Sequence, residues 1–391
     1  MPVDTVGIQT VSVPVAAVVD FARRAFAAVG VPEEDAARAG AALVDADVQG
    51  ISTHGVKNLS GYVRAVRDGK VNPRPEVRVT GGTVPSGEAG KPTSAMVKMS
   101  GDNGLGHVAA GRGMETAIDL AREYGVGCVF MAQSNHYGAS GYWARLAVRA
   151  GMAGFAVTNA MASIAPWGGT APMIGNNPPA WAIPTFDTSA AGEAGNAAGS
   201  AVTGYDMPDS IYLDMALSVV AGNRLDIYAR RGLPIPSGWA LDKDGEPSTD
   251  ARVRAKGGTF APVAEYKGYG LALLLSLFTS VLSGGAFDDE QLNATRQPDK
   301  WPSSATNRSH WFMAFDVTRL VPREEFGQRV REIAERIRSS DRKAGVDRLH
   351  VPGDMERERA RRQLSEGLSY ESFILDDLKA LAELLGIPLG L

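Results

Sequence analysis

The chain has 391 residues, of which 44% are hydrophobic and 21% are charged, and its formal net charge is −4. This composition is ordinary for a globular protein, and the length suits roughly two domains. Because basic side chains are not in excess, we expect neither nucleic acid nor an anionic membrane surface as a partner. The single cysteine, Cys128, lies in an apolar run and excludes an intrachain disulfide, which fits a reducing compartment.

No secretory or membrane-spanning segment is predicted. Residues 1–14 have neither a basic start nor an apolar core, so they do not resemble a signal peptide. The longest apolar run, residues 271–282, is too short to cross a bilayer, which takes about 20 residues. We therefore expect a cytoplasmic protein without a membrane partner.

Three helices are predicted in the first part of the chain. Residues 15–29 repeat apolar side chains at helical spacing and end at Gly30. Residues 32–48 begin with proline and three acids, which suit the positive end of a helix dipole. A third helix is expected over residues 56–68, so His54 falls in the turn before it, where its ring is accessible.

Strands and helices alternate in the middle of the chain. Runs of β-branched residues over 77–99 precede an amphipathic helix at 108–124 and a buried strand at 126–132. His136 stands just past the end of that strand, which is where α/β proteins favour ligand sites. The next elements are a helix and a strand, at 142–150 and 154–158.

The second half of the chain contains a long segment without helical or strand periodicity. Residues 185–209 are rich in Ala, Gly, Ser and Asp, and we expect a long surface loop or mobile flap there. A strand over 180–184 precedes this loop. An apolar helix over 267–282 and a strand over 311–317 follow, and from Pro322 onward the pattern predicts charged helices with Glu and Arg at i,i+4 spacing.

Two of the five histidines lie in glycine-rich turns. His54 is part of the run ISTHGV at 51–56, and His136 is part of SNHYG at 134–138. Glycine lets the backbone approach a ligand closely, and histidine exchanges protons near neutral pH. The two runs therefore predict proton transfer on a bound small molecule. The other histidines, expected to be structural or at the surface, are His107, His310 and His350.

Two other enzyme types are alternatives. The run Gly104-Leu105-Gly106 opens a G-x-G-x-x-A pattern typical of Rossmann-type dehydrogenases, but no acid follows near residues 133–135, where such a site needs one. A hydrolase or lyase using the two histidines is the second alternative. The chain has no G-x-S-x-G elbow, and no histidine pair has the spacing of metal ligands, so no metal site is expected.

Nine short motifs occur in an order that resembles a known family. They are GISTHGV at 50–56, GDNGLG at 101–106, SNHYG at 134–138, PWGG at 166–169, GNNP at 175–178, DMA at 214–216, GWALD at 238–242, KGYG at 267–270 and PGD at 352–354. Together they resemble the malate/L-lactate dehydrogenase family, which is unrelated to the classical Rossmann enzymes. Its relatives include ureidoglycolate and sulfolactate dehydrogenases, diketogulonate reductases and reductases of cyclic imine carboxylates.

The resemblance implies both a fold and an activity. It implies an α/β fold of the α+β type, with a non-Rossmann cofactor domain on a mostly antiparallel sheet over 81–321. Helical regions at 1–80 and 322–391 are expected to pack together. The implied activity is hydride transfer between NAD or NADP and a keto, hydroxy or imine substrate by an enzyme that is typically a homodimer. A non-catalytic NAD(P) sensor is the alternative among binding proteins.

Catalytic and substrate-binding roles follow from the resemblance by position. It makes His54 the general acid in reduction and the general base in oxidation, whereas the residues alone also allow a turn histidine bonded to backbone. His136 corresponds to a second family histidine at the substrate, and alone it also allows a helix cap. The other predicted substrate contacts are Thr53, Lys57, Asn58 and Tyr62.

The resemblance places cofactor contacts at Asn159, Ala160, Leu213, Asp214, Met215, Ala216, Ser218, Lys267, Gly268, Gly353 and Asp354. The Asp214 carboxylate is expected to bind ribose, although a strand-end acid that caps the following helix is also possible. Lys267 opposes the dipole at a helix start, which suits a nearby pyrophosphate. Acidic Asp187 and Glu193 disfavour a 2′-phosphate, so NAD is favoured over NADP.

The chain departs from the family where the substrate is expected to bind. The family usually has arginine four residues after the first histidine, where this chain has Asn58 beside Lys57. Asparagine lacks the charge with which arginine binds a carboxylate, so we expect a modified substrate in place of plain pyruvate or oxaloacetate. Thr53 and Ala160 each replace a usual serine, but the Thr53 hydroxyl still allows a hydrogen bond to His54.

Overall fold

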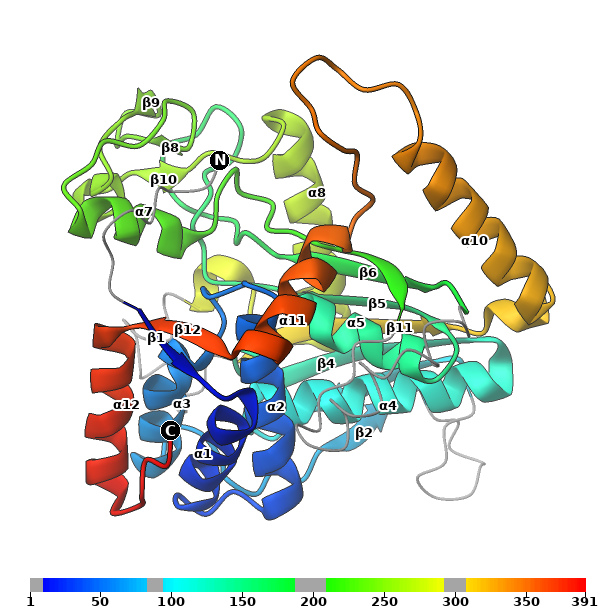
Figure 1. Cartoon of the computed structure of the whole chain (residues 1–391), viewed down its shortest axis with the longest axis horizontal. Helices are drawn as coiled ribbons and strands as arrows, with labels where there is room; N and C mark the ends of the chain where they lie inside the picture. The colour runs from blue at the N-terminus through cyan, green and yellow to red at the C-terminus, as the bar shows by residue number, and fades with distance from the viewer. Residues whose placement is uncertain (1–9, 83–93, 187–208, 292–306) are drawn as a thin grey trace. The chain divides into compact units, whose positions relative to one another are not determined.

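A computed structural model describes residues 10–82, 94–186, 209–291 and 307–391 of the protein (Figure 1). The chain divides into two compact units. Unit 1 comprises Met1–Arg74, Pro184–Ile211 and Val321–Leu391, and unit 2 comprises Pro75–Ile183 and Tyr212–Leu320. The domain boundaries predicted after residues 80 and 321 lie near two of these limits. The loop expected over 185–209 falls almost entirely outside the described residues.

Unit 1 is mainly helical, and both ends of the chain contribute to it. Its helices are α1 (Val15–Ala27), α2 (Glu33–Val48), η1 (Val56–Asn58), α3 (Leu59–Arg67), α10 (Arg323–Arg338), α11 (Asp354–Glu366) and α12 (Ser372–Leu385). The three helices predicted near the N-terminus are confirmed, with small shifts at their ends. Strand β1 (Thr10–Val13) pairs antiparallel with β12 (Leu368–Glu371), which joins the first and last parts of the chain (Figure 1).

Small side chains let α1 and α2 pack closely. The face of α1 that carries Val18, Phe21 and Ala25 is fully shielded from solvent. A Cβ atom at Gly40 of α2 would lie only 3.1 Å from the backbone nitrogen of Arg23 on α1. Burial of these apolar faces stabilises helices that would be marginal alone. The packing of the two helices therefore fixes the end of α2, where the next turn begins.

Unit 2 is built on a seven-stranded sheet with the order β2-β3-β4-β11-β5-β6-β7. The strands are β2 (Arg78–Gly81), β3 (Met96–Ser100), β4 (Val126–Ser134), β5 (Ala153–Thr158), β6 (Pro179–Pro184), β7 (Ser210–Asp214) and β11 (Arg308–Phe315). Only β3 and β4 pair in parallel among the pairs whose register is defined, and β2–β3, β4–β11, β11–β5 and β5–β6 are antiparallel. The predicted mostly antiparallel α+β fold is confirmed. The Rossmann alternative is wrong, because it requires a parallel sheet.

Helices α4 (Gly106–Tyr124) and α5 (Ser140–Arg149) cover one face of this sheet (Figure 1). Glycine makes the contact close, since a Cβ atom at Gly127 of β4 would lie 2.0 Å from the carbonyl oxygen of Ala117 on α4. The strand and the helix therefore approach to backbone contact. This packing fixes the end of β4, from which the segment carrying His136 emerges.

The opposite face of the sheet meets α8 (Tyr266–Ser276), which continues into a π-helical turn, η3 (Leu277–Val281). Phe278 of η3 stacks on Trp311 of β11, with ring centres 4.9 Å apart. The remaining elements of unit 2 are α7 (Gly222–Arg230), β8 (Ala240–Leu241), β9 (Pro247–Ser248), η2 (Val253–Lys256), β10 (Thr259–Phe260) and η4 (Val317–Arg319). None of the helices in the described ranges combines the length and apolar character needed to cross a bilayer.

Candidate active site

The His54 turn, residues 51–58, begins where α2 ends. The backbone N–H of Ile51 donates to the carbonyl of Ala46 at 2.7 Å, and that of Gly50 donates to the carbonyl of Asp47 at 2.8 Å. With Gly50 at φ 75°, this is a Schellman ending, which glycine favours because it enters the left-handed region without strain. The helix therefore stops at a defined residue, and the histidine follows in a turn, as predicted.

Neighbouring side chains orient the ring of His54. The Thr53 hydroxyl lies 2.8 Å from His54 Nδ1, so the hydrogen bond that the sequence allowed is present. The Asn58 side-chain amide donates to the Thr53 carbonyl at 3.0 Å and braces the turn. When the hydroxyl donates to Nδ1, the proton of the neutral imidazole resides on Nε2. Nε2 can then exchange a proton with a bound molecule.

A buried carboxylate holds the other side of the His54 turn. Asp47 of α2 is 7% exposed and accepts hydrogen bonds from the Val56 backbone N–H and the Tyr370 hydroxyl, both at 2.9 Å. Burial raises the pKa of Asp47 to about 7, although these two hydrogen bonds and the charge of Lys57 lower it. Asp47 and Tyr370 were not predicted to be site residues, because 323 positions separate them and no sequence motif joins them.

The other predicted substrate contacts lie on η1 and α3. Lys57, Asn58 and Tyr62 are each half-buried. Asn58 and Tyr62 are four residues apart, which places them on one face of the helical segment. Because the Asn58 amide bonds to the Thr53 carbonyl, the residue in place of the expected arginine supports the turn and brings no positive charge.

The His136 turn, residues 135–138, follows β4 in unit 2. The Asn135 side chain donates to the Asn103 side chain at 3.0 Å and to the Gly104 carbonyl at 2.9 Å. A Cβ atom at Gly106 would lie 2.2 Å from the carbonyl oxygen of Asn135 and 2.4 Å from that of His136. Gly106, one of the two glycines that suggested a dinucleotide fingerprint, therefore lets the first turn of α4 pack against the His136 backbone.

The half-buried ring of His136 is also oriented through Nδ1. That nitrogen accepts the backbone N–H of Gly138 at 3.4 Å, a long hydrogen bond, and Gly138 takes φ 78°. An accepting Nδ1 puts the proton of the neutral ring on Nε2. The rings of the two turns thus present the same tautomer when the Thr53 hydroxyl donates to His54.

Asp214 ends β7 and faces the first turn of α5. Its Oδ2 accepts the backbone N–H of Gly141 at 2.7 Å, and the helix dipole stabilises a carboxylate at this position. The alternative in which Asp214 caps the helix after it is wrong, because α5 precedes β7 in the chain. The contact with a ribose stays a prediction.

A buried polar cluster holds the segment around Ala160. Asn177 accepts the backbone N–H of Ala160 at 2.8 Å and donates to Asp288 at 2.9 Å. Asp288 also accepts the N–H of Gly175 at 2.7 Å, and burial raises its pKa to about 6 despite these hydrogen bonds. Asn159 is fully buried, with its side chain bonded to backbone groups. The GNNP motif therefore has a structural role here, and Asp288 was not anticipated.

The start of α8 is a strained turn. Ala264 and Glu265 have φ 50° and 57°, a region that residues with a Cβ atom seldom adopt. A Cβ atom at Gly268 would lie 1.8 Å from the carbonyl oxygen of Val263, so glycine is required. Strain of this kind is concentrated at functional sites, which agrees with the role predicted for Lys267, an exposed residue in the same turn.

The other predicted cofactor residues of unit 2 differ in exposure. Leu213 of β7 is 42% exposed. Ser218 is buried, and its hydroxyl donates to the carbonyl of Val220 at 2.8 Å. Met215 and Ala216 are partly buried between them. The segment after β7 therefore offers both exposed and buried groups.

Gly353 and Asp354 form the start of α11 in unit 1. Gly353 has φ 95°, and the Asp354 carboxylate forms a bidentate ion pair with Arg338 of α10 at 2.8 and 2.9 Å. Burial raises the pKa of Asp354, hydrogen bonds from Arg338 and the Val351 N–H lower it, and the net shift is downward. The ionised carboxylate thus anchors α11 to α10.

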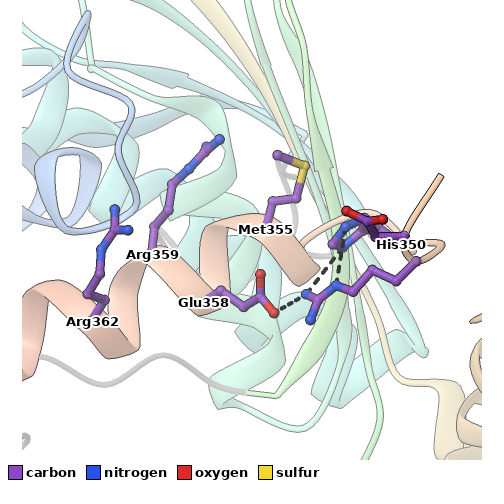
Figure 2. Close-up of a pocket in the computed structure, with 7 residues that line it drawn as sticks. His350, Met355, Glu358, Arg359 and Arg362 are labelled. Atoms are coloured by element: carbon purple, nitrogen blue, oxygen red, sulfur yellow. Dashed lines mark hydrogen bonds and ion pairs between the residues drawn. The ribbon is translucent and has the colours of Figure 1, made fainter. Parts of the chain in front are cut away.

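Two cavities lined by charged side chains flank α11. The first, of about 530 Å³, is lined by Asp347, Arg348, His350, Met355, Glu358, Arg359 and Arg362 (Figure 2). Figure 2 shows an ion pair of Glu358 with the neighbouring Arg348. The second, of about 570 Å³, adjoins Asp354 and Arg338, and its Arg357 pairs with Asp209. Several of the arginines that line the two cavities are therefore already paired with carboxylates.

Two of the remaining histidines are structural, as predicted. His107 and His310 are fully buried, and desolvation lowers the pKa of each to about 3, so both are neutral. The two ring nitrogens of His310 lie 2.9 and 2.8 Å from the hydroxyls of Thr158 and Ser134. In the part of the chain that the structure describes, no group of three His, Cys, Asp or Glu side chains is placed to hold a metal ion.

Comparison with known proteins places this site in context. Residues 13–379 match the family model for malate/L-lactate dehydrogenase. A malate dehydrogenase from Pyrococcus horikoshii is 32% identical over 96% of each chain, and a solved structure of malate dehydrogenase from Pyrococcus horikoshii OT3 has a TM-score of 0.81 at 29% identity, covering 97% of this chain and 98% of that chain.

Relatives with other named activities have nearly the same sequence identity to this chain. A (2R)-3-sulfolactate dehydrogenase (NADP(+)) from Chromohalobacter salexigens is 31% identical over 92% of this chain and 94% of its own. A ureidoglycolate dehydrogenase (NAD(+)) from Escherichia coli O157:H7 is 31% identical over 76% of this chain and 81% of its own. The similarity therefore extends across proteins with different substrates and cofactors in their names.

Proposed function

Because the chain belongs to the malate/L-lactate dehydrogenase family and is an NAD(P)-dependent dehydrogenase or reductase, we propose that it transfers a hydride between nicotinamide and a 2-keto acid, a 2-hydroxy acid or a cyclic imine. The His54 turn carries this proposal. Its imidazole is oriented through Nδ1 by the Thr53 hydroxyl at 2.8 Å, and the proton of the neutral ring is on Nε2 when this hydroxyl donates. Reduction of a carbonyl or imine requires such a donor.

The two histidines have different roles in this mechanism. The cofactor supplies the hydride in reduction and takes it up in oxidation. As the substrate carbon gains a hydride, its oxygen or nitrogen needs a proton, which His54 donates from Nε2 and takes back in oxidation. His136 binds a polar group of the substrate through Nε2–H, whose direction follows from the hydrogen bond that Nδ1 accepts from Gly138.

Residues of unit 2 have the chemistry that a nicotinamide dinucleotide needs. Asp214 offers a partly exposed carboxylate for ribose hydroxyls, and Lys267 offers an exposed cation for the pyrophosphate. The strained turn before α8 and the close packing of Gly268 hold Lys267 in place. The side chain of Ser218 is already bonded to the Val220 carbonyl, so its part is to shape this segment.

The preference for NAD over NADP is part of the proposal. It rests on the acidic residues Asp187 and Glu193, which lie outside the described residues. Both cofactors occur in the names of the relatives, so the family alone does not decide between them.

The substrate is expected to differ from pyruvate or oxaloacetate around Asn58. This side chain has no charge, and its amide is used to brace the Thr53 carbonyl at 3.0 Å. A carboxylate at this place would lack the bidentate clamp that arginine provides. Either Lys57 takes over as a single cation, or the substrate presents a neutral group to Asn58 and Tyr62.

A homodimer located in the cytoplasm is also part of the proposal, and the sheet of unit 2 bears on the dimer. On the face opposite α4, a row of apolar side chains runs through Met96, Cys128, Met313, Phe155 and Trp181. Met96 and Trp181, at its two ends, are 56% and 43% exposed. Phe155 in the middle of the row is only 2% exposed, so the exposed groups are Met96 and Trp181, which are of residue types enriched where proteins bind one another. A second copy of the chain is the partner that we expect here.

Fluorescence titration with NADH and with NADPH tests cofactor binding and preference together. Steady-state assays across 2-keto acids, cyclic imine carboxylates and larger keto compounds then identify the substrate class. In His54→Gln, we expect kcat to fall about 100- to 10,000-fold while the Kd of the cofactor changes little. Cofactor binding without turnover of any substrate would favour a sensor, and fast turnover of pyruvate or oxaloacetate would contradict a modified substrate.

A further inference from the structure

We propose that Asp47 is a positioning residue for proton transfer, which together with Tyr370 clamps the turn that carries His54. The inference rests on the proposed function in one respect, the role of His54 as proton donor. Neither residue belongs to a motif that suggested a function in the sequence. Their role follows from the contacts they make in unit 1.

The clamp joins three parts of the chain. Asp47 lies on α2, Val56 is the first residue of η1, and Tyr370 is on β12. One oxygen, Asp47 Oδ2, accepts both the Val56 backbone N–H and the Tyr370 hydroxyl at 2.9 Å. Because β12 is held by its pairing with β1, Tyr370 is a fixed donor. The position of the carboxylate, and through it that of the turn, is therefore set from outside the turn.

The second oxygen of Asp47 is in contact with the backbone beside His54. A Cβ atom at Gly55 would lie 1.7 Å from Asp47 Oδ1 and 2.2 Å from its Cγ. Gly55 has φ −82°, which any residue adopts, so the reason for glycine is space and not backbone conformation. The carboxylate thus packs directly on the residue after His54.

A neighbouring acid shows that burial alone does not explain the clamp. Asp45 is also fully buried on α2, and Gln49, the residue directly after this helix, donates a hydrogen bond to its carboxylate. Both oxygens of Asp47 instead contact the turn, and Oδ2 also accepts the hydrogen bond from Tyr370. Burying an acid is costly without such partners, so the contact with the turn offsets the cost at Asp47.

Positioning matters because proton transfer is sensitive to small displacements. A displacement of about 1 Å can cost about 100-fold in rate. The Thr53 hydroxyl orients the His54 ring, but it moves with the turn, whereas Asp47 connects the turn to α2 and β12. Without Asp47, we expect the ring to sample several positions while the fold and the cofactor contacts of unit 2 persist.

The test compares Asp47→Ala with Asp45→Ala as the matched control. For Asp47→Ala we expect kcat to fall about 10- to 100-fold, with little change in the Kd of the reduced cofactor. Asp47→Asn keeps one acceptor oxygen and should restore most of kcat. Tyr370→Phe removes one hydrogen bond and should lower kcat about two- to fivefold, which keeps the test open if Asp47→Ala does not fold.

A second readout follows His54 directly. In protein labelled with ¹³C-histidine, the five histidines give few enough ring signals to follow one by one, and His54→Gln assigns its own. We expect Asp47→Ala and Tyr370→Phe to shift or broaden the His54 signal and change its titration, whereas Asp45→Ala leaves it as in the wild type. A residue that only stabilised the fold would change the melting temperature but not this signal.

The outcomes separate the two proposals. If His54→Gln keeps full activity, the proposed function fails, whatever the Asp47 variants do. If His54→Gln is inactive while folded Asp47→Ala and Tyr370→Phe match the wild type in kcat and in the His54 titration, the positioning proposal alone is overturned. Equal losses in Asp45→Ala and Asp47→Ala would overturn it as well.

Discussion

The two histidine turns look alike in sequence, but the structure holds them by different means. Around His54, hydrogen bonds from polar side chains hold the turn: Asp47 accepts the Val56 N–H, and Asn58 donates to the Thr53 carbonyl. Around His136, the backbone packs against Gly106 of α4, and the neutral amide of Asn135 provides the hydrogen bonds.

This difference predicts different sensitivities. A turn held by a buried carboxylate responds to pH and to the loss of single hydrogen bonds, because a titrating group is part of its support. A turn held by close backbone packing responds to added volume, because the neighbouring backbone cannot move aside. Variants of each turn can therefore test this difference.

The largest effect is expected at Gly106. In Gly106→Ala the added methyl group meets two carbonyl oxygens, the nearer at 2.2 Å, so the free energy of unfolding should fall by about 3 kcal/mol. Gly270→Ala is the control, since nothing lies within 4 Å of a Cβ atom there, and it should stabilise α8 by up to about 1 kcal/mol. Urea denaturation measures both, and equal stability of the two variants would show that the His136 turn is not held by packing.

Gly55→Ala should cost less, about 2 kcal/mol in stability, because the new methyl group meets a side chain and not a backbone carbonyl, and Asp47 can give way by losing its two hydrogen bonds. The same substitution in an Asp47→Ala background should cost little, since the carboxylate that it meets at 1.7 Å is gone. A double-mutant cycle by denaturation gives the coupling energy between the two positions. Strictly additive changes in the free energy of unfolding would mean that Asp47 and residue 55 are not in steric contact in solution.

A pH dependence is expected from Asp47, the buried acid that holds the His54 turn. The pKa of Asp47 rises from 3.8 to about 7 on folding, so the folded state holds this proton more tightly than the unfolded chain. This contribution is fully present below pH 3.8 and is lost as the pH rises toward 7, with a slope of at most about 1.4 kcal/mol per pH unit.

The comparison of wild type with Asp47→Asn isolates this slope. Asp288, with a pKa of about 6, contributes in the same direction, and neutral His107 and His310 contribute in the opposite direction below pH 6.5, but all three are common to both proteins. The groups facing Asp47 are the Val56 N–H, the Tyr370 hydroxyl and the charge of Lys57. Parallel stability curves from pH 4 to 8 would show that Asp47 does not titrate in this range.

The smallest effect is expected at Asn58. Asn58→Ala removes the hydrogen bond to the Thr53 carbonyl and should lower stability by about 1 kcal/mol. Because the bond lies in the turn, kcat should also fall a few-fold, with the NADH titration unchanged. Asn58→Asp, which cannot donate to the carbonyl, should behave like the alanine variant. A loss confined to substrate KM would instead place the Asn58 amide on the substrate.

Local pattern was sufficient for much of this molecule. Apolar spacing predicted the helices of the first part of the chain, and Gly30 and the acids at the start of α2 predicted where the first helix ends and the second begins. The same reasoning placed His54 in a turn and His136 past a buried strand. The mostly antiparallel sheet came from the ordered motifs of the family and not from periodicity, which cannot state which strands pair.

Only the tertiary structure decided which groups hold the two turns. Tyr370 reaches Asp47 across 323 positions, and Asp214 contacts α5, which lies earlier in the chain. A hydrogen bond or a close backbone contact depends on distance in space, and one sequence encodes that distance only through the packing of the whole unit. The sequence by itself therefore indicated which residues are expected to do the chemistry, whereas the packing decided what keeps them in place.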